Sequence, residues 1–351
     1  MKTVMTDSAA PFFTVVVPVH DKAGCLQRSV ASILKQSTGD FELLLIDDAS
    51  TDSSLEVMQR LEDPRIRILR RDTPGAGGYA ARNLGIREAR GEWVAFLDAD
   101  DEWYPDHLHV LRGLTRESGS QFVSTGWLNN YDGGVPRPSR FSAFVGPRTI
   151  RLNLIAFLRE CVNDRVPLWT GAVAVRRGLI RKTGGFPEDC RKGGDTAAWL
   201  KLMNVAGDLF VSGRQTALYH RIDSSVTRNT RAEVKDNCIF KACRELIKQS
   251  PNRETVKLLM RFSNFHVSYG LRKRATNGSL RFSDCNAHYL RVDWAHHVLF
   301  RLHSLAPQKI QPALWASCSR LKRLLYCKQR GGYPVDADDP NDSAIQEKGP
   351  R

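Results

Sequence analysis

The sequence predicts an α/β fold, with a doubly wound, mostly parallel sheet of the Rossmann-like kind followed by a helical C-terminal region. Short apolar runs alternate with helical repeats from residue 13 to about residue 110, as in a sheet whose strands are joined by helices. Aspartates directly follow two of these runs, and the carboxyl ends of parallel strands form one edge of a sheet. Beyond residue 230, strand patterns give way to helical stretches rich in Lys and Arg. That edge of the sheet is therefore the first place to look for a binding site.

The first part of the chain contains four predicted strands and the helices that join them. Each strand is a continuous apolar run, which is typical of a strand buried on both faces of a parallel sheet. The strands are FTVVVPV (13–19), FELLLI (41–46), RIRIL (65–69) and WVAFL (93–97). Apolar residues at helical spacing predict helices over 21–35, 50–60 and 76–90.

The pattern is looser after residue 110. It predicts a Gly/Pro-rich loop over 126–148, a helix over 150–162, a strand over 171–175, a loop over 184–194, a helix over 195–206 and a strand that ends near Tyr219. Basic helical stretches follow over 231–249, 252–270, 282–304 and 311–327. We therefore expect a flexible N-terminus (1–11), an α/β domain (12–228), a basic helical region (229–330) and a disordered tail (331–351).

The composition is that of an ordinary globular protein. With 351 residues, 42% hydrophobic and 26% charged, the chain can bury a sizeable core and is neither collagen-like nor disordered. The first residues lack the apolar stretch of a signal peptide, and no run approaches the ~18–20 apolar residues of a membrane span. The eight cysteines have no metal-ligand spacing. We therefore expect a cytoplasmic protein, at most peripheral to a membrane, whose cysteines are reduced and structural.

The charge is distributed unevenly along the chain. Residues 1–110 carry 12 basic and 18 acidic side chains, whereas residues 231–330 carry 20 and 6. Two interpretations of the basic region stay open, namely attraction to an anionic membrane surface and simple solvation of the helices. A nucleic-acid-binding protein is a further alternative, but the region has no helix-turn-helix or zinc-finger pattern.

Two acidic clusters follow predicted strands at the same edge of the sheet. Asp98, Asp100 and Asp101 follow WVAFL, and Asp47 and Asp48 follow FELLLI. Carboxylate oxygens are the ligands that Mg²⁺ and Mn²⁺ prefer, so the first cluster is a candidate metal site. An acidic turn that caps the next helix is the alternative. The second cluster has the chemistry to accept the imide N–H of a pyrimidine base or to cap the helix that follows it.

Two further groups are candidates for chemistry. Asp195 follows a Gly-rich loop at the start of a predicted helix, where it is placed to act as a general base or as the helix cap. Arg82 and Asn83 follow a Gly-rich segment, and a guanidinium beside backbone amides suits a diphosphate. The sequence lacks the phosphate loop of ATPases, the dinucleotide-binding glycine motif and the nucleophile elbow of serine hydrolases. Kinases, dehydrogenases and serine hydrolases are therefore excluded.

Taken in order, the motifs resemble those of the family 2 inverting glycosyltransferases, which have the GT-A fold. The matching segments are VVVPVHDKAGCLQRSVASILKQS, FELLLIDDASTDSS, GYAARNLGIREARGEWVAFLDADDEW and GGFPEDCRKGGDTAAWLKL, within about residues 12–228. The resemblance implies transfer of a sugar from a UDP- or dTDP-type nucleotide sugar to a hydroxyl of a glycan or lipid-linked glycan. Such enzymes assemble bacterial cell-surface polysaccharides.

The resemblance also implies roles for the matching residues on the donor side. It assigns nucleotide binding to Pro18, His20 and Asp21, base recognition to Asp48, the lining of the donor site to Arg82 and Asn83, and the D-x-D motif to Asp98 and Asp100. Asp98 would lie near the ribose. Asp100 would bind the Mn²⁺ or Mg²⁺ that bridges the diphosphate.

On the acceptor side, Asp195 matches the catalytic base of the family and would take the proton of the attacking hydroxyl. Gly194 stands where the family usually has a Glu. Acceptor-side positions also match at Gly171, Trp199 and Arg221. His220 falls in a region where some members have a histidine metal ligand, and a structural histidine is the alternative.

One other enzyme class shares this architecture, the nucleotidyltransferases that make nucleotide sugars. They require a Gly-rich, basic loop after the first strand, and PVHDKAG does not provide one. The expected partners are thus a nucleotide-sugar donor, a glycan or lipid-linked glycan acceptor and an anionic membrane surface. No nucleic acid is expected.

Overall fold

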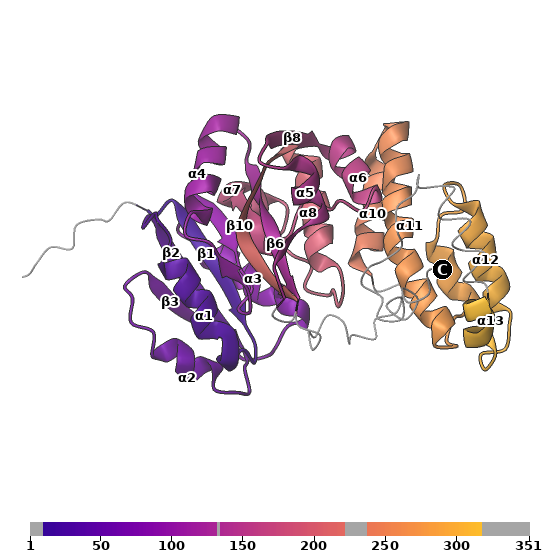
Figure 1. Ribbon diagram of the computed structural model, residues 1–351, viewed down its shortest axis with the longest axis horizontal. Helices are drawn as coiled ribbons and strands as arrows, with labels where there is room; N and C mark the ends of the chain where they lie inside the picture. The colour runs from indigo at the N-terminus through magenta and orange to yellow at the C-terminus, as the bar shows by residue number, and fades with distance from the viewer. Residues whose placement is uncertain (1–9, 132–133, 222–236, 318–351) are drawn as a thin grey trace, which may run out of the picture. The chain divides into compact units, whose positions relative to one another are not determined.

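Four parallel strands form the first half of the sheet, where the apolar runs predict them. The computed structural model describes residues 10–131, 134–221 and 237–317. The strands are β1 (Phe13–Val19), β2 (Phe41–Asp48), β3 (Ile66–Arg71) and β4 (Trp93–Phe96), in the spatial order β3-β2-β1-β4. Every neighbouring pair in this half is parallel, so the α/β prediction is confirmed (Figure 1).

The second half of the sheet is mixed. The order continues with β9 (Val173–Arg176), β6 (Phe122–Tyr131), β10 (Asp208–Arg221) and β5 (Glu102–Trp103). Strand β9 is antiparallel to both of its neighbours, while β6 and β10 are parallel to each other. The short strands β7 (Arg137–Pro138) and β8 (Thr149–Asn153) pair with β6 and β10. The described sheet therefore has ten strands.

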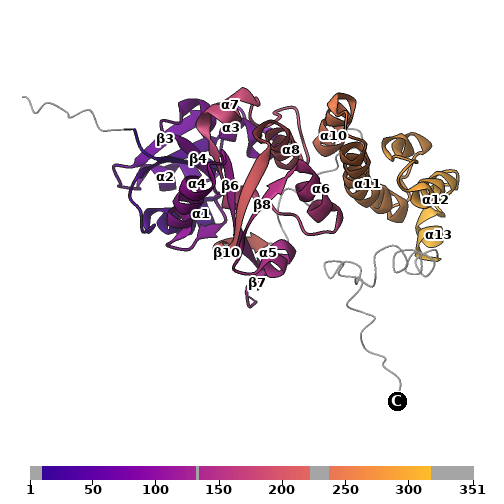
Figure 2. The ribbon, with the colours of Figure 1, turned by 90° about the horizontal axis from the view of Figure 1, so that it is seen from above.

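Helices cover both faces of the sheet and bury a separate core on each. One face carries α1 (Ala23–Leu34), α2 (Ser54–Gln59) and α4 (His107–Ser118), and the other carries α3 (Tyr79–Glu88), α7 (Arg177–Lys182) and α8 (Gly194–Ala206). In β1, Val15 and Val17 join the first core and Val16 joins the second, as the two-residue repeat of a strand requires. Figure 2 shows α1 and α3 on opposite sides of the strands.

Two predictions in the middle of the chain are wrong. The predicted loop over 126–148 contains the end of β6, strand β7 and helix α5 (Arg140–Val145), and the first residues of the predicted helix over 150–162 belong to β8. Pairing with β10 explains why both segments form strands. The end of β6 and most of β8 lack a continuous apolar pattern, but each forms a ladder of backbone hydrogen bonds with β10. Helix α6 (Leu154–Val162) then begins where the Asn153 side chain accepts the Ala156 N–H at 2.9 Å.

The C-terminal residues are helical, as predicted. The elements are α10 (Cys238–Gln249), α11 (Arg253–Thr276), the 3-10 turn η4 (Phe282–Ala287), α12 (Trp294–Ser304) and α13 (Gln311–Ser317). The predicted continuous helix over 282–304 is wrong, because the chain leaves the helix after η4 and Asp293 caps a new one. Contacts divide the chain into two compact units, with the boundary between Val267 and Ser268, inside α11.

Some predictions lie outside the described residues. They are the N-terminus up to residue 9, the tail 331–351, and residues 231–236 and 318–327 of two predicted helices. Within the ranges that the structure describes, no helix is both long enough and apolar enough to cross a bilayer.

His107 makes the folded protein sensitive to acid. The imidazole is fully buried at the start of α4, stacks 4.2 Å from the Trp103 ring and shares a 2.8 Å hydrogen bond with the Thr216 hydroxyl. Burial lowers its pKa from 6.5 to about 3. The neutral form therefore stabilises the fold above pH 6.5, and this contribution is lost as the pH falls from 6.5 towards 3, by about 1.4 kcal/mol per pH unit.

We expect a His107→Gln variant to lose part of this acid sensitivity. Its urea midpoint should change less between pH 7 and pH 5 than that of the wild type. An equal change in both proteins would contradict the assignment. His109, on the same helix and outside the core, is the matched control position.

Candidate active site

The carboxyl ends of β1, β2 and β4 bring the predicted donor-side residues to one edge of the sheet. The parallel register places Val19 beside Asp47 and Val16 beside Phe96, so the loops after all three strands leave the sheet together. The Asp48 carbonyl and the His20 imidazole are joined by a 2.9 Å hydrogen bond. The sheet topology thus brings the two acidic clusters together, as the sequence predicts.

Asp48 is buried and held by two donors. Its carboxylate forms an ion pair with Arg71, at the end of β3, and accepts the Gly75 N–H at 3.1 and 3.2 Å. Only 2% of its side chain is exposed. Sequence reasoning missed Arg71, although the same rule of strand ends that selected Asp48 also applies to it.

Asp98 pairs with a buried arginine. Arg82 forms an ion pair with the Asp98 carboxylate and donates to the Gly77 carbonyl at 3.1 Å. Burial disfavours the guanidinium charge, but Asp98 and, less strongly, Asp195 favour it and leave the pKa of Arg82 raised. The rings of Tyr79 and Phe186 lie 6.0 and 5.6 Å from the guanidinium carbon. Arg82 is therefore the fixed positive charge at the centre of the candidate site.

The second aspartate of the D-x-D motif has a cationic partner that the sequence analysis did not single out. The Lys22 ammonium, at the start of α1, lies 2.6 Å from Asp100 Oδ2. Burial opposes the charge of Lys22, while Asp100 favours it, and the pKa of Lys22 is raised. Asp100 is therefore not an open carboxylate in this structure.

Asp101 is the buried member of the acidic cluster. Its Oδ1 accepts the His220 N–H at 2.8 Å, and its Oδ2 has no hydrogen-bond partner among the described residues. Burial, together with the charges of Asp98 and Asp100, raises the pKa of Asp101 well above its usual value. Asp101 therefore takes up a proton more readily than an exposed aspartate does.

His220 is engaged by both of its ring nitrogens. Nε2 lies 2.7 Å from a Glu102 oxygen, and Nδ1 lies 3.3 Å from the Asn130 amide nitrogen. This arrangement fits the structural alternative better than a metal ligand, because a ligand needs a ring nitrogen that faces the ion. The metal role of His220 stays a prediction.

The D-x-D carboxylates have the chemistry for a divalent cation but do not form a closed cage. Their side chains are 32% (Asp98) and 22% (Asp100) exposed, and their oxygens are hard donors. In the described part of the chain, no group of three or more His, Cys, Asp and Glu side chains is arranged to hold a metal. A cation at Asp100 would therefore take most of its ligands from a bound diphosphate and water, as Mg²⁺ commonly does.

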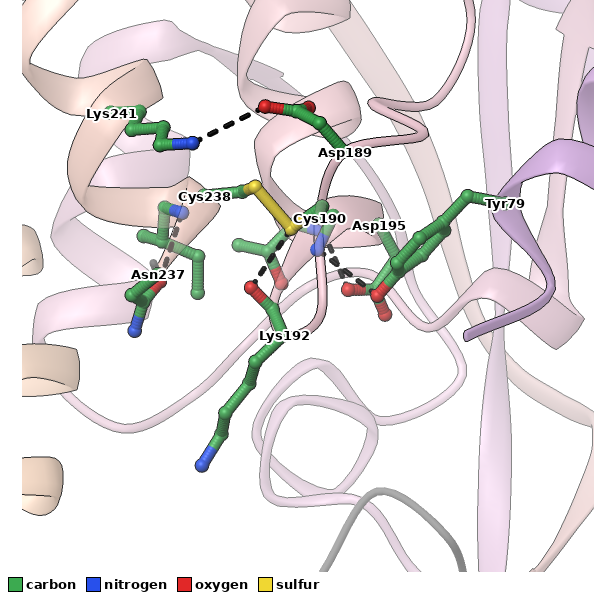
Figure 3. The surroundings of a disulfide bond; sticks show 11 residues. Tyr79, Asp189, Cys190, Lys192, Asp195, Asn237, Cys238 and Lys241 are labelled. Carbon is green, nitrogen blue, oxygen red and sulfur yellow. Dashed lines mark hydrogen bonds and ion pairs between the residues drawn. A yellow bond between two sulfur atoms is a disulfide. The ribbon is translucent and has the colours of Figure 1, made fainter. Parts of the chain in front are cut away.

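Asp195 lies in the first turn of α8, beside this cluster. Its Oδ1 accepts the Thr196 N–H at 2.8 Å, while the neighbouring Gly194 N–H donates to the Tyr79 hydroxyl at 3.1 Å (Figure 3). Burial is the largest influence on Asp195 and raises its pKa, against the opposing effects of the Thr196 N–H and Arg82. Burial and Asp195 also raise the pKa of Tyr79 to about 12, so its hydroxyl stays protonated. A carboxylate with a raised pKa is suited to accept a proton.

Three predicted residues serve the packing around the site. The Asn83 amide spans the loop after α7, donating to the Phe186 carbonyl at 2.8 Å and accepting the Phe186 N–H at 2.8 Å. Trp199 is 3% exposed and packs on Phe96, which counts against direct contact with an acceptor. Gly171 has no room for a side chain, because a Cβ there would lie 2.4 Å from the Trp169 ring.

The remaining predicted residues line the edges of the site. Asp21 accepts the Thr51 N–H at 2.7 Å, and this bond lowers its pKa. Pro18, at the end of β1, lies beneath the glycine turn that leads into α3. Arg221, at the end of β10, donates to the Tyr131 hydroxyl at 2.9 Å. Pro18 and Asp21 thus lie on the β1 side and Arg221 on the β10 side of the sheet.

A disulfide anchors the loop that leads to Asp195. Cys190 and Cys238 are bonded, with their Cα atoms 6.0 Å apart, and the Cys238 N–H donates to the Lys192 carbonyl at 3.2 Å (Figure 3). The expectation of reduced cysteines is therefore wrong for this pair. The two cysteines are 48 residues apart in the sequence, and this spacing does not indicate that they pair. They meet only because the chain between them folds into α8 and β10 and returns. Among the described residues, Cys25, Cys161, Cys243 and Cys285 are free thiols, as predicted.

We expect removal of this disulfide to destabilise the protein by about 2–4 kcal/mol, because the unfolded chain regains the freedom of a closed loop. Urea unfolding of a Cys190→Ser variant under non-reducing conditions measures the effect. Cys25→Ser, which removes a free and partly exposed thiol, is the matched control. Equal midpoints for wild type and Cys190→Ser would contradict the bond, as would a peptide map without the 190–238 link.

The same fold occurs in solved glycosyltransferases. The crystal structure of S. aureus TarS 1–349 in complex with UDP-GlcNAc matches with a TM-score of 0.70 and 19% identity, covering 88% of this chain and 92% of that one. The mannosyltransferase PcManGT from Pyrobaculum calidifontis, in complex with GDP-Man and Mn²⁺, matches with a TM-score of 0.55 and 19% identity, covering 89% and 87%. The fold is therefore of the GT-A class.

Sequence similarity identifies the family. The model of glycosyl transferase family 2 matches residues 14–175. TuaG of Bacillus subtilis, named for teichuronic acid biosynthesis, is 32% identical over 226 residues, which is 62% of this chain and 82% of TuaG. The succinoglycan biosynthesis protein ExoO of Rhizobium meliloti is 31% identical over 65% of this chain and 66% of its own. The chain belongs to glycosyl transferase family 2.

The similarity does not extend over the full length of every relative. The match covers only 30% of an uncharacterized glycosyltransferase of Rickettsia felis, which is 30% identical over 190 residues.

Proposed function

We propose that the protein is an inverting glycosyltransferase that moves a sugar from a UDP- or dTDP-type donor to a hydroxyl of a glycan or lipid-linked glycan. The observation that carries the proposal is the position of Asp195, a partly buried carboxylate with a raised pKa beside the Arg82–Asp98 pair. Family membership and the names of TuaG and ExoO support a role in cell-surface polysaccharide assembly. Membership also favours this function over nucleotide-sugar synthesis or nucleic-acid binding.

In the proposed reaction, Asp195 takes the proton of the acceptor hydroxyl while the hydroxyl oxygen attacks the anomeric carbon. The bond from that carbon to the diphosphate oxygen breaks, and the nucleoside diphosphate leaves from the opposite face. A single displacement inverts the anomeric centre. The raised pKa of Asp195 brings the base closer to the working pH than an exposed aspartate would be.

We assign the binding of the nucleotide-sugar donor to the acidic residues at the carboxyl ends of the strands. Asp48 would recognise the base, and Arg71 and the Gly75 N–H hold its carboxylate in place. Asp98 would lie near the ribose, and Asp100 is the residue that would hold Mn²⁺ or Mg²⁺, which would neutralise charge on the departing diphosphate. The UDP-GlcNAc complex of TarS supports a nucleotide-sugar donor for this fold.

We also propose that the basic helical region (229–330) contacts an anionic membrane surface. Val298 and Leu302 on α12 and Leu305 at its C-cap are 40%, 64% and 69% exposed and recur every three or four residues, on the side opposite the buried Phe300. Residues 231–330 carry 20 basic against 6 acidic side chains. An exposed apolar stripe in a basic region is the pattern of a helix that lies at a lipid surface.

A thermal-shift screen of UDP-, dTDP- and GDP-sugars, each with and without Mn²⁺, tests the proposed donor. A donor at 100 times its Kd stabilises the fold by about 2.7 kcal/mol. Stabilisation by a uridine or thymidine diphosphate sugar that grows with Mn²⁺ is the expected result. If no nucleotide sugar raises the melting temperature, the proposed function is wrong. Sedimentation with phosphatidylglycerol vesicles, compared with phosphatidylcholine vesicles, separately tests the membrane contact.

A further inference from the structure

Both the backbone and the side chain of Lys22 are held in place at the candidate site. It is the residue before α1, and its backbone N–H donates to the Ser54 hydroxyl at 2.8 Å. Its side chain is 31% exposed, and the ammonium lies 2.6 Å from Asp100 Oδ2. The backbone anchor and the short ion pair together fix a positive charge on the D-x-D motif.

The neighbouring carboxylates have positive partners as well. Arg82 pairs with Asp98, and Arg28 lies 3.1 Å from Glu102 and donates to the Asp100 carbonyl at 2.8 Å. Asp98, Asp100 and Glu102 each therefore already have a protein cation as partner. A divalent cation that approached Asp100 would meet the ammonium within a few ångströms, and like charges at such distances repel.

A nucleoside diphosphate changes this balance. It brings about two to three negative charges, and phosphate oxygens accept hydrogen bonds from ammonium groups. The Lys22 side chain has four rotatable carbons and is partly exposed, so it can exchange Asp100 for a phosphate oxygen without moving the backbone. Asp100 would then be open to a cation.

We propose that Lys22 is the resident counter-ion of Asp100 and couples metal binding to donor binding. Without nucleotide, Lys22 keeps Asp100 occupied and the divalent cation binds weakly. With nucleotide, the ammonium moves to the diphosphate, and Asp100 takes up the cation that the diphosphate brings. Lys22 is a positioning residue for the cation, and it also binds the diphosphate of the nucleotide-sugar donor. This proposal rests on the proposed function.

Binding of Mn²⁺ in the absence of nucleotide tests the first half of the proposal. Free Mn²⁺ is measured by electron paramagnetic resonance for wild type, Lys22→Gln, Lys22→Arg and Arg28→Gln. We expect Lys22→Gln to bind Mn²⁺ about tenfold more tightly than wild type, a change of about 1.4 kcal/mol, and Lys22→Arg to stay near wild type. Arg28→Gln is the control for the loss of one positive charge, because Arg28 contacts the Asp100 carbonyl and not the Asp100 carboxylate.

Titration of UDP with Mn²⁺ present, by calorimetry, tests the second half. Lys22→Gln should bind UDP about tenfold more weakly, with a melting temperature close to that of the wild type. Unchanged or weaker Mn²⁺ binding by Lys22→Gln would overturn the proposal, as would an equal gain in Arg28→Gln, which indicates general charge rather than a specific counter-ion. If the wild type binds no UDP, the proposed function fails instead, and the Mn²⁺ titration still decides the role of Lys22 as counter-ion.

Discussion

Asp195→Asn is expected to lower kcat for sugar transfer by about a thousandfold, within the range in which a positioned general base contributes. The amide has the shape of the carboxylate and still accepts the Thr196 N–H, so the first turn of α8 should stay intact. Because the amide cannot take a proton from the acceptor hydroxyl, the chemical step alone is affected. Steady-state kinetics with the donor identified by the thermal-shift screen measures the effect.

The control for this experiment lies in the loop before α8. Asp189→Asn removes a carboxylate that is 74% exposed and pairs only with Lys241 among the ion pairs described, so transfer should be nearly unchanged. Donor affinity should be equal in both variants and in wild type. If the Asp195→Asn enzyme keeps a tenth or more of the wild-type kcat, Asp195 is not the general base.

Arg82→Met is expected to lower the free energy of unfolding by about 2–3 kcal/mol. Removing one partner of a buried ion pair leaves the other charge uncompensated, which costs about 3–5 kcal/mol in a closed interior. Asp98 is 32% exposed, so water recovers part of this cost. Arg82 also favours the charged form of Asp195, and its loss should raise the pKa of that carboxyl further. Urea unfolding at neutral pH measures the change.

A double variant separates the ion pair from the packing of the arginine stem. If the unpaired Asp98 charge causes the loss, Arg82→Met with Asp98→Asn should recover more than half of the lost stability. A double variant that is less stable than Arg82→Met would show that Asp98 is not the group left uncompensated. Together with the Asp98→Asn single variant, these measurements form a double-mutant cycle, which isolates the interaction energy.

The sequence predicted the parallel half of the sheet well and the mixed half poorly. Runs such as 13–19 and 41–46 are buried on both faces, so their apolar character is continuous and unambiguous. Strand β6 ends in the polar Leu128–Tyr131 segment, and β8 is a largely exposed edge strand, so neither has a strong pattern of its own. Strand β10 pairs with both segments, and such long-range pairing cannot be seen in a local sequence pattern.

In the candidate site as well, some residues could be predicted from the sequence and others could not. Strand ends and the family resemblance located Asp48, Asp98 and Asp195, because topology alone brings those positions together. The basic partners Lys22 and Arg71 could not be selected, since Lys and Arg are common on any surface and only a distance distinguishes a pair. The 190–238 disulfide was mispredicted for a related reason, because its two halves meet only through tertiary folding.

The disulfide also makes part of the chain a covalent ring. Residues 190–238 form a closed circuit that contains α8 and β10, and with them Asp195, His220 and Arg221. A single protease cut anywhere between the two cysteines therefore opens the ring without releasing a fragment. On a gel the nicked protein would run as one piece until thiols are added, and a redesign with new chain ends inside the ring would stay tied together by its own sulfur bridge.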